Sequence, residues 1–334
     1  MPHAAAMTMK ALAYVAAHPL ADFAIRETEL PTPTLRPHDL LVEVRAFATN
    51  PADCKVRGTR SGTPQAPVVL GWDAAGVVVA VAPEAAGFAV GDEVYFAGDV
   101  TRAGCYAELV AVDARLVAHK PTRLDFAEAA ALPLTSLTAW EAVIDRGVRG
   151  TVLVIGGAGG VGSIAIQLLK AVSKARVVAT ASRPETIAWC KELGADHTID
   201  HRGDLEAQLA AIGIPAVDFV LSTQHTEPLL PQITQVLRPF GELALIDDPK
   251  SLDIVPLKRK SLTVHWEFMF TRSMFGHAMA SQGEILAKVA ALIDASAVRS
   301  TMRTRLGGFT AAHVASAHAA HEAGTAIGKI VIAR

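Results

Sequence analysis

The sequence predicts an α/β protein of two domains, one built on a doubly wound parallel sheet and the other on a β-barrel. From about residue 127 to 271, apolar strands alternate with helical patterns, which is typical of a parallel sheet. From residue 9 to about 126, short strands are separated by glycines and prolines, which favours a compact barrel or folded sheet. A chain of 334 residues is long enough for two full-sized cores.

Three segments support the β-barrel interpretation. Leu40–Phe47 alternates between apolar and polar residues like a half-buried strand, and Gly76–Val81 is typical of a more fully buried one. Pro31–Pro37 is expected to be a loop, because its three prolines lack the N–H that a strand would donate.

The C-terminal tail is predicted to return to the β domain. It ends in a strand at Lys329–Ile332, which follows a helix with one apolar face formed by Ile285, Leu286, Val289, Leu292 and Ile293. Residues 9–126 and 272–334 are therefore expected to form one domain and residues 127–271 the other.

The second domain begins with two predicted helices, Asp125–Ala131 and Thr135–Val143, separated by Pro133. Five strands are expected after these helices, at Thr151–Ile155, Arg176–Thr180, Val217–Leu221, Glu242–Ile246 and Leu262–Phe268. A helix is expected at Pro184–Leu193, with Gly194 as its C-cap.

The strand at Thr151–Ile155 leads into Gly157-x-Gly159-x-x-Gly162 and then into a helix with one apolar face. Gly157 is expected to allow a tight turn, Gly159 to let the backbone approach a pyrophosphate, and Gly162 to let the helix pack closely on the strand. The helix N-terminus offers unpaired N–H groups and a partial positive charge to phosphates. Because strand, glycines and helix occur together, we interpret this segment as a dinucleotide-binding fingerprint.

The end of the next strand favours NADPH over NADH. An NAD site usually has an acidic residue at this position, whereas Thr180-Ala181-Ser182-Arg183 has a hydroxyl beside a guanidinium. Arginine can hold a 2′-phosphate through paired, charge-assisted hydrogen bonds. Glu185 argues against this preference, although an acid in a first helical turn is also explained by the helix dipole.

Composition excludes several classes of partner. The formal charge of −2 leaves no basic excess for nucleic acid or an anionic membrane, and no apolar run approaches the ~20 residues of a membrane helix. The first eight residues lack the layout of a signal peptide. Three scattered cysteines make a disulfide framework unexpected and fit a reducing, cytoplasmic location.

With these features in place, the chain resembles the medium-chain dehydrogenase/reductase superfamily, specifically its quinone-oxidoreductase branch. The matching segments span almost the whole chain: Asn50–Asp53, Val69–Gly76, Val90–Val94, Ala130–Glu141, the glycine fingerprint and Gly328–Val331. Glu267–Phe275 is most similar to a subgroup often labelled zinc-type alcohol dehydrogenase-like. The resemblance implies a GroES-like domain split around a Rossmann domain, with the active site between them, and a homodimer, commonly joined through the Rossmann sheet edges.

The resemblance also implies a set of cofactor-binding residues. Asn50 and Thr138 would line the nicotinamide, and the fingerprint residues would face the pyrophosphate. The full set is Asn50, Thr138, Ala158, Gly159, Gly160, Val161, Gly162, Thr180, Ser182, Arg183, His201, Thr223, Leu245, Ile246, Phe268, Phe270 and Lys329. Candidates for the substrate slot are Asn50, Trp72, Thr138 and Phe270, although tryptophan and phenylalanine are more often core residues.

The zinc ligands of metal-dependent relatives are not matched. The position of their cysteine is Ala52, and their Gly-His-Glu is Gly71-Trp72-Asp73 here, with an indole that cannot ligate zinc. The segment matching their structural-zinc lobe is short and carries one thiol, Cys105. We interpret His313, His318 and His321 as exposed or capping histidines of an alanine-rich helix, and expect no metal.

These observations predict an NADPH-dependent, zinc-independent reductase of quinones or α,β-unsaturated carbonyls. No proton donor is compelling, although Asp53, Cys54 and Lys55 follow Asn50, and solvent is an alternative. Tyr106 is interpreted as structural. Three alternatives remain open: an alcohol dehydrogenase with an unrecognised metal, an enoyl-thioester reductase, and a non-catalytic NADPH-binding protein.

Overall fold

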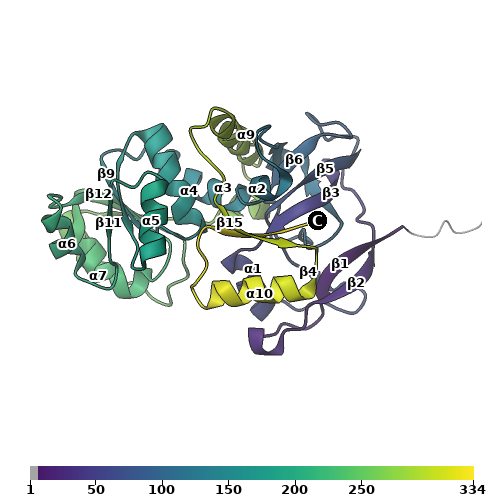
Figure 1. Cartoon of the computed structure of the whole chain (residues 1–334), viewed down its shortest axis with the longest axis horizontal. Helices are drawn as coiled ribbons and strands as arrows, with labels where there is room; N and C mark the ends of the chain where they lie inside the picture. Colours follow the sequence, from purple (N-terminus) through teal and green to yellow (C-terminus); the bar gives the residue numbers. More distant parts are fainter. Residues whose placement is uncertain (1–6) are drawn as a thin grey trace, which may run out of the picture. The chain divides into compact units, whose positions relative to one another are not determined.

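The computed structural model describes residues 7–334, and the chain forms two compact units (Figure 1). Unit 1 contains the residues up to Leu134 and Phe270–Arg334, and unit 2 contains Thr135–Met269. The expected boundaries after residues 126 and 271 thus lie after Leu134 and Met269. The first boundary lies later than expected because α2 (Phe126–Ala130) belongs to unit 1, where it packs on strands β3 (Asp39–Ala48) and β5 (Ala74–Val81).

Unit 2 is a Rossmann domain with a six-stranded, fully parallel sheet in the order β11-β10-β9-β12-β13-β14. Numbered along the chain, this is the doubly wound order 3-2-1-4-5-6, which reverses direction between β9 and β12. The strands are β9 (Thr151–Ile155), β10 (Arg176–Thr180), β11 (His197–Ile199), β12 (Val217–Ser222), β13 (Leu237–Leu245) and β14 (Thr263–Trp266). The five predicted strands are present, and only the three-residue β11 was not predicted.

Helices cover both faces of this sheet. The elements are α3 (Pro133–Ala139) with the π-helical η3 (Trp140–Ile144), α4 (Gly160–Leu168) with η4 (Leu169–Ser173), α5 (Pro184–Glu192), α6 (Leu205–Ala211), α7 (Thr226–Val236) and the 3₁₀-helix η5 (Val255–Lys260). Pro133 was expected to lie between two helices, but in the structure it is the first residue of α3. Proline is favoured there because the first turn needs no N–H donor.

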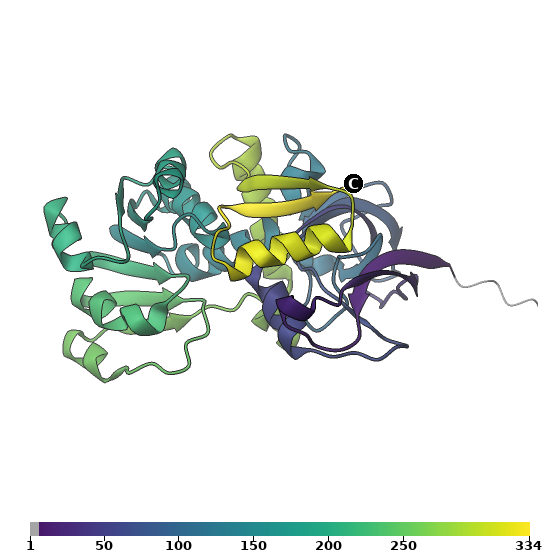
Figure 2. The same ribbon diagram turned by 60° about the horizontal axis from the view of Figure 1, so that its bottom comes forward.

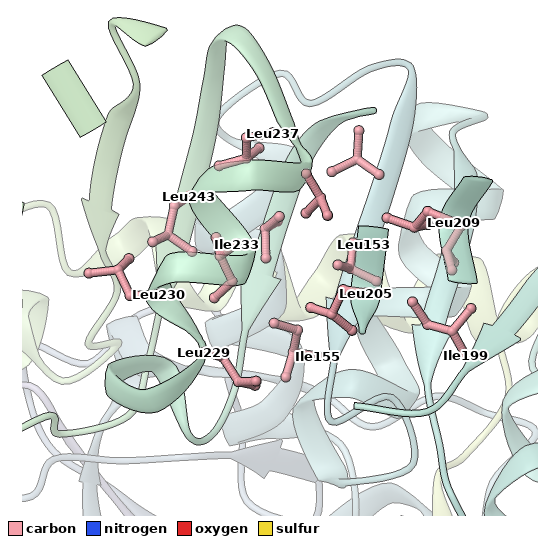
Figure 3. Close-up of a cluster of buried hydrophobic side chains, with 14 of the residues drawn as sticks. Leu153, Ile155, Ile199, Leu205, Leu209, Leu229, Leu230, Ile233, Leu237 and Leu243 are labelled. Atoms are coloured by element: carbon pink, nitrogen blue, oxygen red, sulfur yellow. The ribbon is translucent and has the colours of Figure 1, made fainter. Parts of the chain in front are cut away.

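One face of the sheet packs against α6 and α7 through a continuous leucine-rich core (Figure 3). Leu153 and Ile155 of β9 point into this core, together with Leu205 and Leu209 of α6 and Ile233 of α7. Alternate residues of a strand point to opposite faces, so Val152 and Val154 are buried on the other face. The apolar run of β9 is explained by burial on both sides.

Unit 1, expected to be a GroES-like domain, contains two sheets. One has the order β15-β16-β3-β5-β6-β8, with β7 also paired to β3, and the other has the order β2-β1-β4. The strands not yet named are β1 (Thr8–Tyr14), β2 (Arg26–Pro31), β4 (Val68–Val69), β6 (Glu93–Phe96), β7 (Leu109–Asp113), β8 (Val117–His119), β15 (Met302–Gly307) and β16 (Lys329–Ala333).

The tail returns to unit 1, where β16 pairs antiparallel with β3. The remaining helices of unit 1 are η1 (Leu20–Asp22), α1 (Pro51–Thr59), η2 (Ala114–Leu116), α8 (Thr271–Phe275), α9 (Ala280–Asp294) and α10 (Ala311–Glu322). The predicted apolar face of α9 is buried, except that Leu292 is only half-buried.

Helix α10 packs on two neighbouring elements of unit 1. It contacts α1 (Figure 1), and it also lies along the β15–β16 strand pair, as the yellow helix of Figure 2 shows. Among residues 7–334, no helix combines the length and apolar character needed to cross a bilayer.

Candidate functional site

The candidate cofactor residues of unit 2 lie at one edge of its sheet. The strands are all parallel, so their carboxyl ends meet at that edge, which is where ligands bind in open α/β sheets. Each strand contributes to that edge. The glycine loop follows β9, Thr180 ends β10 with Ser182 and Arg183 after it, His201 follows β11, and Thr223 follows β12. Leu245 ends β13, Ile246 follows it, and Phe268 follows β14.

The glycine loop has the local geometry of a phosphate site. Gly157 was expected to allow the tight turn, but the residue with a left-handed backbone is Gly156, whose φ is +78°. Gly159 precedes α4 with an ordinary extended backbone, and a Cβ added to it would meet only the Gly156 carbonyl oxygen, at 3.4 Å. The absence of a side chain at Gly159 therefore leaves open space beside the N-terminus of α4, where the N–H groups and helix dipole favour an anion.

The other two glycines of the fingerprint are required by packing. A Cβ on Gly162 would lie 2.3 Å from the Gly156 carbonyl oxygen, and one on Gly157 would lie 2.7 Å from the Ala179 Cβ. Both distances are impossible contacts, so these glycines allow α4 and β10 to approach the loop. Their role is internal to the protein, whereas no such packing constraint requires glycine at position 159.

The end of β10 is tied to the glycine loop by two hydrogen bonds. The Thr180 hydroxyl accepts from the Gly156 N–H at 2.9 Å, and the Thr180 carbonyl accepts from the Gly157 N–H at 3.2 Å. The Thr180 side chain thus supports the loop. Beyond it, Ser182 and Arg183 are half-buried, and Arg183 Nε lies 3.1 Å from Glu185 Oε1.

The remaining predicted residues of unit 2 differ in how much surface they present. Thr223 is half-buried and its hydroxyl donates to the Ile155 carbonyl at 2.8 Å, which ties the ends of β12 and β9 together. Leu245 is fully buried in the α6–α7 core, while Phe268 is half exposed. His201 is half-buried, and burial lowers its pKa. Thr138 is buried on α3.

Asn50 and Lys329, predicted to contact the cofactor, lie in unit 1 within a buried polar cluster. The Lys329 ammonium donates to Asp73 Oδ2 at 2.8 Å, to the Thr49 carbonyl at 3.0 Å and to Asn50 Oδ1. Asn50 Nδ2 in turn donates to Asp73 Oδ2 at 3.0 Å. An ammonium has three protons, so those of Lys329 are all used within unit 1. Contact of Lys329 with the cofactor stays a prediction, and the role visible here is to fix the Asn50 side chain.

Asp73 is the charged centre of this cluster. It is completely buried, and its second oxygen accepts from the Leu134 N–H at 2.9 Å. Burial raises the pKa of Asp73, and Lys329 opposes that shift. In the sequence Asp73 stands out only as a mismatch to a zinc motif, and no local pattern points to its partner Lys329, 256 residues away.

The three residues considered as proton donors have different environments. Asp53 is fully buried at the start of α1, accepts from the Asn50 N–H at 2.6 Å, and has a pKa raised to about 7 by burial. Burial also raises the pKa of Cys54 to about 12, which disfavours a thiolate. Lys55 is exposed. Asp53, whose pKa lies near neutrality, is thus sealed from solvent, and no proton donor is assigned among these three residues.

Trp72 and Phe270, the aromatic slot candidates, are both 2 % exposed and pack edge to face with ring centroids 6.1 Å apart. The Trp72 indole N–H donates to the Asp99 carbonyl at 3.1 Å. Their role at a substrate stays a prediction.

The residues at the zinc-motif positions do not fit a zinc ion. Ala52 has no donor atom, the Trp72 nitrogen is a hydrogen-bond donor, and both Asp73 oxygens are occupied. Within the part of the chain that the structure describes, no three His, Cys, Asp or Glu side chains gather as metal ligands would.

The interpretation of His318 as an exposed or capping histidine is wrong. It is fully buried where α10 packs on α1, and its Nδ1 accepts from Arg57 at 2.8 Å. Because arginine can only donate, Nε2 carries the proton and faces the Tyr106 hydroxyl at 3.3 Å. Tyr106 also hydrogen-bonds Asp53. Burial and the neighbouring guanidinium lower the pKa of His318 to about 3, so the ring is neutral.

Comparison with known proteins identifies the family. Residues 36–122 match the family described as alcohol dehydrogenase GroES-like domain, and residues 160–303 match the zinc-binding dehydrogenase family. The chain is 36 % identical over 321 residues to a zinc-type alcohol dehydrogenase-like protein of Staphylococcus aureus, with 93 % of this chain and 94 % of that protein covered. The chain belongs to the medium-chain dehydrogenase/reductase superfamily. It is therefore an oxidoreductase of a family whose members bind nicotinamide cofactors.

The chain is also similar to three further oxidoreductases. An NADPH-dependent alkenal/one oxidoreductase of Arabidopsis thaliana is 31 % identical, covering 92 % of this chain and 75 % of that protein. A solved structure from Rhizobium etli, assigned to the zinc-dependent alcohol dehydrogenases, superposes with a TM-score of 0.95 at 47 % identity, with 98 % of both chains covered. The quinone oxidoreductase of Coxiella burnetii gives a TM-score of 0.81 at 28 % identity, covering 98 % of this chain and 100 % of that one.

Proposed function

We propose that this protein is an NADPH-dependent reductase that delivers hydride to quinones or α,β-unsaturated carbonyls without zinc. The observation that carries the proposal is the carboxyl edge of the Rossmann sheet, where open space at Gly159 adjoins the N-terminus of α4 and a guanidinium, Arg183, follows β10. These groups suit a pyrophosphate and a 2′-phosphate respectively. The activities by which the Arabidopsis and Coxiella relatives are named support the same classes of cofactor and substrate.

Bound NADPH would supply the hydride, and the protein would supply orientation and electrostatics. Residues 158–162 would hold the pyrophosphate, and Arg183 with Ser182 would hold the 2′-phosphate. In unit 1, Lys329 and Asp73 hold the Asn50 carboxamide in one orientation, and we propose that this fixed group contacts the nicotinamide. The donor groups at the zinc-motif positions do not fit a metal, so we assign the reaction to acceptors that are already electrophilic and take hydride at carbon. Solvent would supply the proton to the resulting oxygen.

The test is oxidation of NADPH and NADH by purified protein with a panel of benzoquinones, naphthoquinones, enones, simple aldehydes and an enoyl thioester. We expect turnover with quinones or enones, faster with NADPH, and unchanged after dialysis against a chelator. Turnover only with aldehydes after zinc addition would instead indicate an alcohol dehydrogenase. Preference for the thioester would indicate an enoyl-thioester reductase. Tight NADPH binding with no NADPH oxidation by any acceptor of the panel would indicate a non-catalytic binding protein.

A further inference from the structure

The Arg183–Glu185 pair lies where the cofactor preference of a Rossmann domain is decided. Arg183 Nε and Glu185 Oε1 are 3.1 Å apart, with the two side chains 39 % and 53 % exposed. The Arg183 backbone is fixed at the start of α5, because its N–H donates to the Thr186 hydroxyl at 3.1 Å and that hydroxyl donates back to the Arg183 carbonyl at 2.8 Å. Glu185 lies in the first turn of the same helix. A ligand that approaches the Arg183 guanidinium therefore also meets the Glu185 carboxylate.

This turn is coupled to the phosphate-binding loop through β10. Thr180, three residues before Arg183, accepts hydrogen bonds from Gly156 and Gly157, at 2.9 and 3.2 Å. The charged pair thus lies a few residues from the glycine loop along a short, anchored segment. In Rossmann domains the side chains at this strand end meet the adenosine ribose.

We propose that Glu185 is a specificity-determining residue that weakens binding of a 2′-phosphate at Arg183 and so narrows the preference for NADPH over NADH. This inference rests on the proposed function, in which Arg183 receives that phosphate. Glu185 occupies part of the hydrogen-bonding capacity of the guanidinium and offsets its charge. A phosphate monoester with nearly two negative charges at neutral pH would also be repelled by the carboxylate, whereas the uncharged 2′-hydroxyl of NADH would not.

The size of the effect follows from the exposure of the pair. Charges a few ångströms apart at a solvated surface interact modestly and are screened by salt. Removal of the carboxylate charge should therefore strengthen binding of a 2′-phosphorylated nucleotide about three- to tenfold at low salt. The gain should shrink as ionic strength rises.

Glu185 also has a purely structural explanation. An acid in a first helical turn interacts favourably with the helix dipole, whatever the ligand. Loss of that interaction would lower the stability of α5 without discriminating between nucleotides. The two roles are therefore separated by measuring selectivity rather than stability or activity.

The experiment uses adenosine 2′,5′-bisphosphate and adenosine 5′-monophosphate, which differ only in the 2′-phosphate, as titrants of the full-length protein in calorimetry. The variant is Glu185→Gln, because glutamine retains an oxygen that can accept from Arg183 Nε and so preserves its orientation. The matched control is Glu192→Gln, an exposed glutamate in the last turn of the same helix. Each titration is repeated at low and high salt.

We expect Glu185→Gln to bind the bisphosphate about three- to tenfold more tightly at low salt, with unchanged monophosphate affinity and no change in the control. If Glu185→Gln leaves the ratio of bisphosphate to monophosphate affinity unchanged or lowers it, the proposed role of Glu185 in specificity is wrong, while the proposed cofactor is unaffected. If the wild type binds none of the four ligands (the bisphosphate, the monophosphate, NADPH and NADH), the proposed function is wrong, and this inference with it.

Discussion

Lys329 and Asp73 form an ion pair that is almost completely excluded from water, with side chains 2 % and 0 % exposed. Such a pair gains little net free energy, because desolvation offsets the attraction, but the loss of one partner leaves an uncompensated charge. The pair is completed by Asn50, the Thr49 carbonyl and the Leu134 N–H, which satisfy the remaining donors and acceptors. Its value to the protein is the unique orientation that it imposes on Asn50.

We predict that Lys329→Met lowers the free energy of unfolding by about 3–5 kcal/mol, since Asp73 would stay buried without its cation. Urea denaturation followed by circular dichroism measures this loss. The double variant Asp73→Asn with Lys329→Met removes both charges and should recover part of it. A single variant within about 1 kcal/mol of the wild type would show that the ion pair is dispensable.

His318 and His321 of α10 are a second group of titratable residues, of which His318 is buried and His321 is half-buried. Burial lowers the pKa of His321 to about 4, below the usual 6.5, and its Nε2 lies 2.9 Å from the Thr49 hydroxyl. The unfolded chain would thus bind a proton between about pH 6.5 and 4 that the folded chain does not. This contribution to stability is complete above pH 6.5 and is lost as the pH falls.

We predict that His321→Asn flattens the acid side of the stability profile. Between pH 6.5 and 4, the free energy of unfolding of the wild type should fall more steeply than that of the variant, by up to about 1.4 kcal/mol per pH unit for one proton. Urea titrations at several pH values give both slopes. The same substitution at exposed His277 is the control, and parallel profiles for wild type and His321→Asn would refute the prediction.

At the scale of elements, the junction of β9, the glycine loop and α4 separates two roles of glycine. Gly162 has no room for a methyl group, whereas Gly159 has a backbone conformation that alanine adopts readily and a Cβ position whose nearest neighbour is the Gly156 carbonyl oxygen at 3.4 Å. The same substitution at the two positions should therefore have opposite consequences for folding and binding.

We predict that Gly159→Ala changes stability by less than about 1 kcal/mol yet weakens NADPH binding at least about tenfold, because its methyl group would occupy the approach of the pyrophosphate. Gly162→Ala should lower stability by about 1–3 kcal/mol through overpacking. Thermal unfolding and fluorescence titration with NADPH measure the two quantities. Undiminished NADPH affinity in Gly159→Ala would argue against this loop as the pyrophosphate site.

At the scale of the whole molecule, the exposed edge of the Rossmann sheet suggests how two copies associate. In the described part of the chain, β14 pairs only with β13, and its exposed positions include Trp266 at 56 % and Val264 at 36 %. An apolar, unpaired sheet edge invites pairing with another strand. We propose a homodimer in which the β14 edges of two copies meet.

Trp266→Lys is predicted to convert this dimer into a monomer, since it would replace exposed apolar surface at the proposed interface with a positive charge on each copy. Sedimentation velocity at micromolar concentrations measures the mass of the species in solution. Val90→Lys, at a position 66 % exposed in unit 1, is the control and should stay dimeric. A monomeric wild type, or a dimeric Trp266→Lys variant, would exclude this interface.

Local sequence patterns determined the alternating strands and helices of the parallel sheet, the glycine loop and the final strand of the chain. These features depend on residues close together in the chain, such as the apolar run Thr151–Ile155 followed by three spaced glycines, and each has a distinctive period or turn residue. The short β11 escaped prediction because three residues carry too little periodicity. The helical histidines were placed on a helix, but the surface that covers them could not be predicted.

Only the tertiary structure decided the polar partners. Lys329 and Asp73 are 256 residues apart, and Arg57 and His318 are 261 apart. The antiparallel pairing of Val331 with Ala48 brings Lys329 beside Asn50, and the packing of α10 on α1 buries His318. A lysine or histidine has the same identity whether it is solvated or buried, so its chemistry is set by neighbours that the linear sequence does not specify.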